Sequence, residues 1–389
     1  MPTLMPYATS SAAVVLFASL GCASDEVAAP AGWLGFADAV AYPAGGTTLT
    51  GLVASDANDD GHLDLITVTR DNLVICILPG TGTGTFDAAA TFAAGSDPRR
   101  AATGDVNGDG VPDLVAIGHF DNGFTVRLGT GAGQFATGTP YALRHHGRLV
   151  AIGDLNGDAY ADVVATHDGS GQPIAIDAFV GSASGVLQRS WNVETDLVTS
   201  RDIALGDFDD DGHTDLAVGV GDARVALLVF RGLGTGAFEG PTDYPPLPTP
   251  IPGSSDGLEN LDVADLNGDG RDDIVAAHHD LIEVVTVRLS TGDGLGEPSQ
   301  IPAASAIDVA LGNVDGDDIF DIVVVHRDAG AISVRRGTGD GVFGEPMFIP
   351  VGPSPISVVL ADLDADGRLD VAVTDLADHK VRVLLNRGP

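Results

Sequence analysis

Short apolar stretches, separated by glycine-rich or acidic turns, follow one another from residue 33 to the end of the chain. Apolar residues alternate with others or run on for a few positions, as in ISVVLAD (356–362), LDVAVTD (369–375) and VRVLL (381–385). Such patterns are typical of half-buried and buried strands, and no stretch shows the spacing of an amphipathic helix. The pattern therefore predicts an all-β protein.

The strands are organised by a repeat whose most regular part is a nine-residue acidic loop. Its seven copies begin 49, 49, 53, 58, 48 and 49 residues apart. In each period one strand precedes the loop and two follow it, and a glycine turn such as GTGTGTF (80–86) then leads to a fourth strand. Four short strands in each period predict the blade of a β-propeller. We expect a seven-bladed β-propeller of four-stranded blades.

The two ends of the chain predict how the ring closes. The last period stops after its third strand, at VRVLLNRGP (381–389), whereas residues 33–45, WLGFADAVAYPAG, look like a fourth strand without its three predecessors. An N-terminal strand that completes the last blade would remove an open sheet edge. We therefore expect one propeller domain over residues 33–389.

These blades resemble the FG-GAP/VCBS repeats of the integrin-α-type β-propeller family, and the resemblance rests on all seven acidic loops. It implies calcium in the loop between the first and second strands, and a role in adhesion or ligand binding. The resemblance does not fix a function, because enzymes and binding modules share this scaffold.

The residue types in the acidic loops also favour a hard cation. In D-x-[DN]-x-D-G-x-x-D, side chains at positions 1, 3, 5 and 9 offer oxygens, position 7 offers its carbonyl, and glycine at position 6 permits a sharp turn. Calcium accepts about six to eight oxygens in flexible geometry, magnesium demands an octahedron, and zinc prefers His or Cys. We expect up to seven calcium ions with a mainly structural role, because a metal-free loop would hold several carboxylates close together.

The predicted ligands are best given by loop position. Position 1 is Asp56, Asp105, Asp154, Asp207, Asp265, Asn313 and Asp362. Position 3 is Asn58, Asn107, Asn156, Asp209, Asn267, Asp315 and Asp364. Position 5 is Asp60, Asp109, Asp158, Asp211, Asp269, Asp317 and Asp366. Position 7 is His62, Val111, Tyr160, His213, Arg271, Ile319 and Arg368. Position 9 is Asp64, Asp113, Asp162, Asp215, Asp273, Asp321 and Asp370.

Two loops depart from this pattern. Loop three has Ala159 at the glycine position, and loop six has Asn313 at position 1 and Asp318 at the glycine position. A side chain at position 6 strains or loosens the turn. We expect these two loops to bind the cation most weakly.

The net charge predicts which partners the protein does not bind, and the N-terminal segment predicts where the protein is located. A formal charge of −36 argues against nucleic acid and anionic lipid as partners. Residues 1–22 predict an export signal, since the apolar stretch 12–20 is too short to span a membrane. Leu20-Gly21-Cys22 resembles a bacterial lipobox, which implies lipidation of Cys22 and a tether over residues 23–32. We expect a monomeric outer-membrane or cell-surface lipoprotein that meets the membrane only through this anchor; the alternative is a secreted protein.

A second set of residues stands at a fixed spacing from the acidic loops, and in three blades it carries a positive charge. Six residues before loop position 1 stand Thr50, Arg99, Arg148, Arg201, Glu259, Ile307 and Ile356. These residues begin the first strand of each blade, so three consecutive blades would place arginine at the mouth of the channel away from the acidic loops. In so acidic a protein, this predicts a site for a uronate, sialate, phosphate or carboxylate-bearing peptide. The alternative is pairing with the neighbouring Asp168, Asp202, Asp280 and Asp328.

Three functions stay open at this point. The leading prediction is a surface binding or adhesion module for a glycan or protein ligand, with His145, His146, His278 and His326 near the arginines. Convergence of these histidines within metal-ligand distance would favour a polysaccharide lyase-like enzyme. A rim whose arginines and histidines are all internally paired would favour a purely structural envelope protein.

Overall fold

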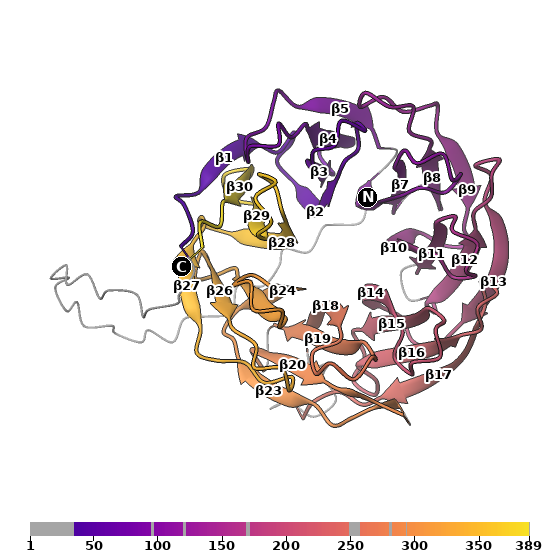
Figure 1. Cartoon of the computed structure of the whole chain (residues 1–389). Coiled ribbons are helices and arrows are strands. Elements are labelled where there is room, and N and C mark those ends of the chain that lie inside the picture. The colour runs from indigo at the N-terminus through magenta and orange to yellow at the C-terminus, as the bar shows by residue number, and fades with distance from the viewer. Residues whose placement is uncertain are drawn as a thin grey trace, which may run out of the picture.

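The computed structural model describes residues 35–94, 97–119, 122–168, 172–248, 257–279, 282–292 and 294–388. Seven four-stranded antiparallel sheets form blades around a central channel (Figure 1). The described ranges hold no helix that is long and apolar enough to cross a membrane. The prediction of an all-β, seven-bladed propeller is confirmed. The predicted signal (1–22) with Cys22, and the tether (23–32), lie outside the described residues.

Six blades take their strands from consecutive segments, ordered from the channel outward. Blade 1 is β2 (Leu49–Ser55), β3 (Asp64–Thr69), β4 (Val74–Leu78) and β5 (Ala90–Ala93). Blade 2 is β6 (Pro98–Gly104), β7 (Asp113–Gly118), β8 (Gly123–Arg127) and β9 (Thr139–Ala142). Blade 3 is β10 (Gly147–Gly153), β11 (Asp162–His167), β12 (Ala175–Val180) and β13 (Gln188–Glu194). Blade 4 is β14 (Ser200–Gly206), β15 (Asp215–Val220), β16 (Leu227–Gly232) and β17 (Phe238–Tyr244). Blade 5 is β18 (Leu258–Ala264), β19 (Asp273–His278), β20 (Val284–Arg288) and β23 (Ser299–Pro302), with a small hairpin of β21 (Ser290–Thr291) and β22 (Gly294–Leu295). Blade 6 is β24 (Ala306–Gly312), β25 (Asp321–His326), β26 (Ala331–Arg335) and β27 (Met347–Pro350).

Blade 7 joins the two ends of the chain. It consists of β28 (Pro355–Ala361), β29 (Asp370–Asp375), β30 (Lys380–Leu384) and β1 (Val40–Pro43). β1 runs antiparallel to β30, from Val40 opposite Val383 to Pro43 opposite Lys380. This pairing confirms that an N-terminal strand closes the ring, although the strand itself is shorter than the predicted segment 33–45.

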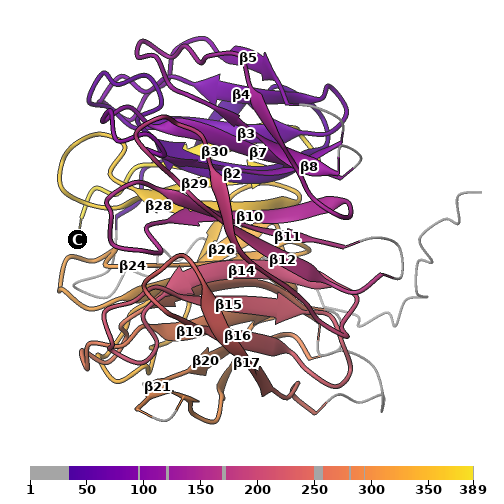
Figure 2. The same cartoon turned by 90° about the vertical axis from the view of Figure 1, so that its right-hand side faces the viewer.

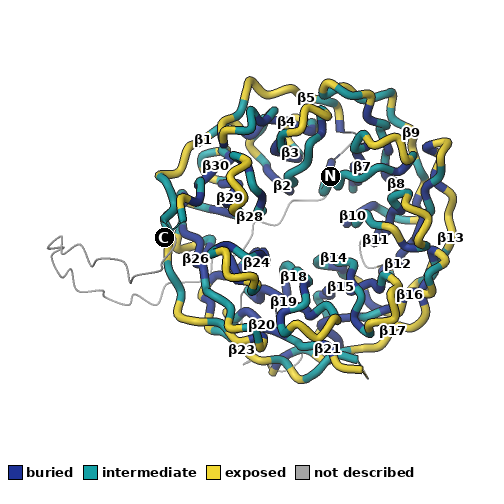
Figure 3. The backbone as a smooth tube through the Cα atoms, in the orientation of Figure 1, coloured by how far each residue is buried: buried dark blue, intermediate teal, exposed yellow. Residues whose placement is uncertain are grey.

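Burial explains why the second strand of each blade reads as a continuous apolar run. All six positions of this strand are buried in every blade, as in β25. The outermost strands are largely exposed (Figure 3). A strand covered on both faces has no polar side to alternate with, whereas the outer strands meet water.

The hydrophobic core lies between neighbouring blades. One cluster joins Val323 and Val325 of blade 6 to Val371 and Val373 of blade 7. Seen edge-on, the strands run across the thickness of the ring and the connecting loops project from its two faces (Figure 2). Because the strands alternate in direction, the acidic loops lie on one face, and the starts of the first strands lie on the other.

Candidate functional site at the mouth of the central channel

The acidic loops share one backbone conformation in all seven blades. Position 6 has positive φ in every copy, with glycine in five, as at Gly110 (φ 84°), and with Ala159 and Asp318 at φ 67°. A residue with a side chain costs about 1–2 kcal/mol in this left-handed region. Loops three and six therefore keep the common shape under strain.

The first residue of the loop organises its backbone. In loop two, the Asp105 carboxylate accepts hydrogen bonds from the amides of Gly108 (2.6 Å) and Gly110 (2.7 Å). The same carboxylate-to-amide pattern recurs at Asp154 and Asp265 in loops three and five. These bonds close the turn around the carboxylate, as in an Asx turn.

The ninth residue has a structural role that the sequence pattern did not reveal. Asp113 is fully buried, and its two oxygens accept from the amides of Val106 (2.9 Å) and Gly129 (2.7 Å). Burial raises the pKa of Asp113 to about 6, while these two bonds oppose the shift. The equivalent Asp215 and Asp370 accept hydrogen bonds from the two corresponding backbone amides in their own blades. Position 9 thus ties the acidic loop to the turn after the third strand.

The remaining loop oxygens fit a hard cation. Asp207, Asp209 and Asp215 each offer a carboxylate oxygen within 4.8 Å of the others, and loop seven repeats this with Asp362, Asp364 and Asp370. Asn58 Oδ1, Asp64 Oδ2 and Asp364 Oδ1 are buried without a hydrogen-bond donor. Buried oxygens without a donor are costly, and a bound cation would relieve that cost. An all-oxygen donor set suits calcium better than zinc.

The residues that stand six positions before the loops share a feature that the sequence alone does not show. Pro98 pairs with Gly118 and Arg100 pairs with Ile117, so the register skips Arg99. Each blade has the same shift between its first and second strands, which makes one residue per blade the extra residue of a β-bulge. We call them the bulge residues: Thr50, Arg99, Arg148, Arg201, Glu259, Ile307 and Ile356. Bulges bend a strand and redirect a side chain.

All seven bulge residues line one cavity of about 600 Å³ in the central channel. Its volume is in the range of small-ligand pockets, about 300–1,000 Å³. Arg99, Arg148 and Arg201, the arginine arc, come from three adjacent blades, and about a third of each side chain is exposed. The three arginines lie together where the register predicted them, and their role in binding stays a prediction.

Each arginine of the arc forms an ion pair with one acidic residue. The closest N–O distances are 3.3 Å from Arg99 to Asp97, 3.6 Å from Arg148 to Asp168 and 3.4 Å from Arg201 to Glu259. A guanidinium has several N–H donors, and Nε of both Arg99 and Arg201 is buried without a hydrogen-bond partner. The arc therefore retains donor capacity.

Electrostatics within the arc also favour an anion. Burial lowers the pKa of Arg148; Asp168 opposes this, and Arg201 and Arg100 lower the pKa further. Like charges that depress one another in a partly buried site are stabilised by a bound anion. The predicted alternative was pairing with Asp168, Asp202, Asp280 and Asp328. All three arginines of the arc are paired with an acidic residue, but only Arg148 pairs with one of these four, Asp168. Asp202 bonds to Asn260, Asp328 pairs with Arg327, and Asp280 lies outside the described residues.

A second set of channel residues, five positions before the loops, was missed by sequence reasoning. Asp202 accepts from the amide of Leu261 (3.1 Å), Asn260 from Val309 (3.4 Å) and Asp308 from Val358 (2.8 Å). Each bond runs from one blade to the innermost strand of the next. That strand faces the channel without a further strand beside it, so its amides need side-chain acceptors. We call Asp202, Asn260 and Asp308 the clasp residues.

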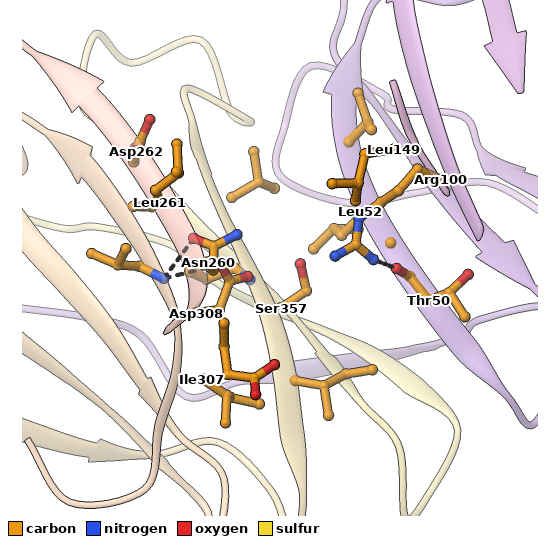
Figure 4. Close-up of a pocket in the computed structure, with 18 of the residues that line it drawn as sticks. Thr50, Leu52, Arg100, Leu149, Asn260, Leu261, Asp262, Ile307, Asp308 and Ser357 are labelled. Carbon is orange, nitrogen blue, oxygen red and sulfur yellow. Dashed lines mark hydrogen bonds between the residues drawn. The ribbon is translucent and has the colours of Figure 1, made fainter. Parts of the chain in front are cut away.

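The charged groups divide the channel into two sides. Figure 4 shows Arg100 and Thr50 on one side, joined by a hydrogen bond, and Asn260, Asp262 and Asp308 on the other. Asp262 accepts from the amide of Leu311 in the next blade (2.8 Å). We call Asp202, Asp262 and Asp308 the acidic wall; of these, Asp262 and Asp308 line the cavity. The arginine arc lies on blades 2 to 4 and the acidic wall on blades 4 to 6, where Arg327 of blade 6 also lines the cavity.

The structure does not bring the four predicted histidines together. His278 and His326 are buried, and their Nε2 atoms contact the hydroxyls of Thr286 (2.9 Å) and Ser333 (2.7 Å) in the same blades. They end second strands, which are buried throughout, so neither lines the channel cavity. His145 and His146 precede blade 3, where the ring of His146 lies 4.7 Å from that of His119. Among the described residues, the groups of three His, Cys, Asp or Glu with atoms within 4.8 Å are the two aspartate triads above.

Known structures share the propeller fold at low sequence identity. A lectin of Agrocybe aegerita that recognises non-reducing terminal N-acetylglucosamine is 17% identical over 79% of this chain and 82% of that chain, with a TM-score of 0.56. BBS1N, solved in complex with ARL6DN, is 12% identical over 90% and 96%, with a TM-score of 0.61. The Dos1 propeller is 11% identical over 87% and 77%, with a TM-score of 0.55. At these identities the likeness shows the fold alone.

Sequence comparison assigns the family. No curated protein sequence matches the chain. The model of the FG-GAP-like repeat matches residues 56–116, 108–165, 207–276 and 313–373, which together make up more than half of the chain. With its seven-bladed fold and acidic loops, the chain belongs to the FG-GAP-like repeat family of β-propellers.

Proposed function

We propose that this protein is a calcium-stabilised binding propeller that recognises an anionic glycan at the mouth of its central channel. One observation carries the proposal: β-bulges in three adjacent blades direct Arg99, Arg148 and Arg201 into one cavity. Arginine pairs with carboxylates through parallel N–H donors, which gives both affinity and orientation.

The overall charge makes the arc selective. At −36, most of the surface repels an anion, so an acidic ligand would be held only where positive charge is concentrated. The arc arginines are partly buried, which weakens screening by salt. A ligand with a carboxylate that fits the cavity matches both conditions.

The shape of the site favours a glycan over a folded protein partner. Stable protein interfaces bury about 800 Å² on each partner, usually over a broad surface. Here the arginines line a concave cavity of about 600 Å³, which suits a small ligand or the end of a chain. The similar fold of a lectin supports glycan recognition, and the similar fold of BBS1N, in complex with ARL6DN, keeps a protein ligand as the second candidate.

The remaining parts of the proposal concern stability and location. Calcium in the acidic loops would neutralise clustered carboxylates on the face away from the cavity. The apolar stretch 12–20 followed by Cys22 supports export and a lipid anchor. In that setting the propeller would display its channel mouth to glycans outside the cell.

The test is the affinity for a glucuronate-containing glycan, measured by titration calorimetry with an N-acetylheparosan tetrasaccharide. Changing Arg99, Arg148 and Arg201 together to Gln should weaken binding by about tenfold or more, because charge-assisted bonds are lost. A matched triple variant at Arg127, Arg144 and Arg224 removes the same charge outside the cavity and should bind normally. Equal binding by the arc variant and the native protein would refute the proposal.

A further inference from the structure

The acidic wall carries more charge than closure of the ring requires. At the clasp position of blade 5, the uncharged Asn260 bonds to the next blade just as Asp202 and Asp308 do in theirs. An amide therefore suffices for this structural role. Two of the three clasp residues are nevertheless carboxylates.

The position three residues before the loops gives a sharper comparison within the repeat. In six blades this position is Val or Ala, namely Val53, Ala102, Ala151, Ala204, Ala310 and Val359. In blade 5 it is Asp262, which lines the cavity. Six blades close without a carboxylate there, so the fold does not explain this charge.

The negative charge of the acidic wall is also energetically unfavourable, because its carboxylates are buried. The pKa of Asp262 is raised to about 6 and that of Asp308 to about 7, first by burial and in part by the neighbouring charge of Asp202. Arg100 opposes the shift at Asp308 and Asp202. Buried like charges are retained most readily where a cation compensates them.

The wall lies deeper in the channel than the arginine arc. Along β18, Asp262 comes three residues after the bulge residue Glu259, a rise of about 10 Å toward the face with the acidic loops. A ligand whose anionic group meets the arc would thus extend its next groups toward the wall.

We propose that the ligand is zwitterionic: it carries a carboxylate for the arginine arc and, deeper in the channel, a protonated amine for the acidic wall. The inference rests on the proposed function and specifies its substrate class as acidic glycans with unsubstituted amino sugars. Each wall carboxylate can accept about four hydrogen bonds. Asp262, which lines the cavity, accepts two bonds from the protein, so acceptor sites remain on it for an ammonium group.

An organic amine fits the wall better than a metal ion does. Within the described ranges, the three wall carboxylates do not form a group with oxygens inside 4.8 Å of one another. They are spread over three blades, which suits a ligand with several separated donors. The same spread would leave a single calcium ion with too few oxygens.

The experiment compares two tetrasaccharides that differ only at nitrogen: N-acetylheparosan and its de-N-acetylated form, which bears primary amines. Both should bind the native protein at neutral pH, the free amine about tenfold more tightly because it adds charge-assisted hydrogen bonds. Asp262→Asn should abolish this preference, so that the two sugars bind the variant with equal affinity. Asp308→Asn should reduce the preference as well.

The outcomes separate this inference from the proposed function. If both sugars bind equally and the arginine variant loses both, the anion site stands and the zwitterion inference is wrong. If neither sugar binds the native protein, the proposed glycan function itself fails. The ratio of the two affinities is the readout, since a general loss of folding in Asp262→Asn would lower both affinities without changing their ratio.

Discussion

At the scale of single residues, the acidic loops show how backbone conformation sets which departures are tolerated. Ala159 and Asp318 keep the positive φ that glycine has in the other five copies. The sequence pattern predicted the strain because both positions break an otherwise regular glycine. It did not predict that the loop would keep its shape, which follows from hydrogen bonds that backbone amides donate to a carboxylate, such as the bond from the amide of Ala159 to Asp154 (2.9 Å).

Relief of this strain gives the first stability prediction. Ala159→Gly should raise the free energy of unfolding by about 1 kcal/mol, since glycine adopts positive φ without a steric cost. Urea denaturation with calcium present measures the change. Ala88→Gly, at an exposed turn position outside the positive-φ set, should give no gain. A gain of equal size in both variants would contradict the account.

At the scale of elements, the innermost strands of neighbouring blades are connected to one another by side-chain hydrogen bonds and not by strand pairing. Fold, blade number and closing strand could be predicted because the repeat shows them directly. The clasp residues could not, because their position holds Gly51, Arg100, Leu149, Asp202, Asn260, Asp308 and Ser357, which share no chemistry. Their partners lie about fifty residues away in the next blade, and only the ring brings them into contact.

The clasp at Asp308 predicts a pH dependence of stability. Its pKa rises from the ordinary 3.8 to about 7 in the folded protein, first because of burial. Between about pH 4 and pH 7 the folded state therefore binds protons more tightly than the unfolded state, and this group lowers stability as pH rises. Asp308→Asn removes the effect, so its stability relative to the native protein should increase across this window, by at most about 4 kcal/mol.

Denaturant melts at several pH values, in saturating calcium, measure this difference. The exposed Asp38 provides a control, since Asp38→Asn should follow the native profile. Parallel profiles for Asp308→Asn and the native protein would show that the clasp does not titrate as described.

At the scale of the whole molecule, the two faces of the ring carry different groups, to which the account assigns different roles. The acidic loops lie on one face, and the arginine arc lies at the channel mouth on the other. The register of arginines was predictable because loops fix the numbering of every blade. The buried histidines were not, because His278 and His326 end strands that are covered on both faces. A residue near a rim in sequence can still be enclosed between blades.

Removal of calcium tests the proposed structural role of the acidic loops. Chelation should lower the melting temperature by about 10 °C or more, because each site held well above its dissociation constant adds about 2–3 kcal/mol. Added calcium should restore the melt, and magnesium should restore it less, since it demands stricter geometry. Identical melts with chelator and with calcium would exclude a structural role for the ion.

The central claim is that the ligand binds at the channel mouth through the arginine arc. A crystal structure of the protein with an N-acetylheparosan tetrasaccharide tests it most directly. The account predicts a glucuronate carboxylate within hydrogen-bond distance of Arg148 and Arg201, with the next sugar directed toward Asp262. A sugar bound on the face with the acidic loops, or on the outer strands, would contradict it.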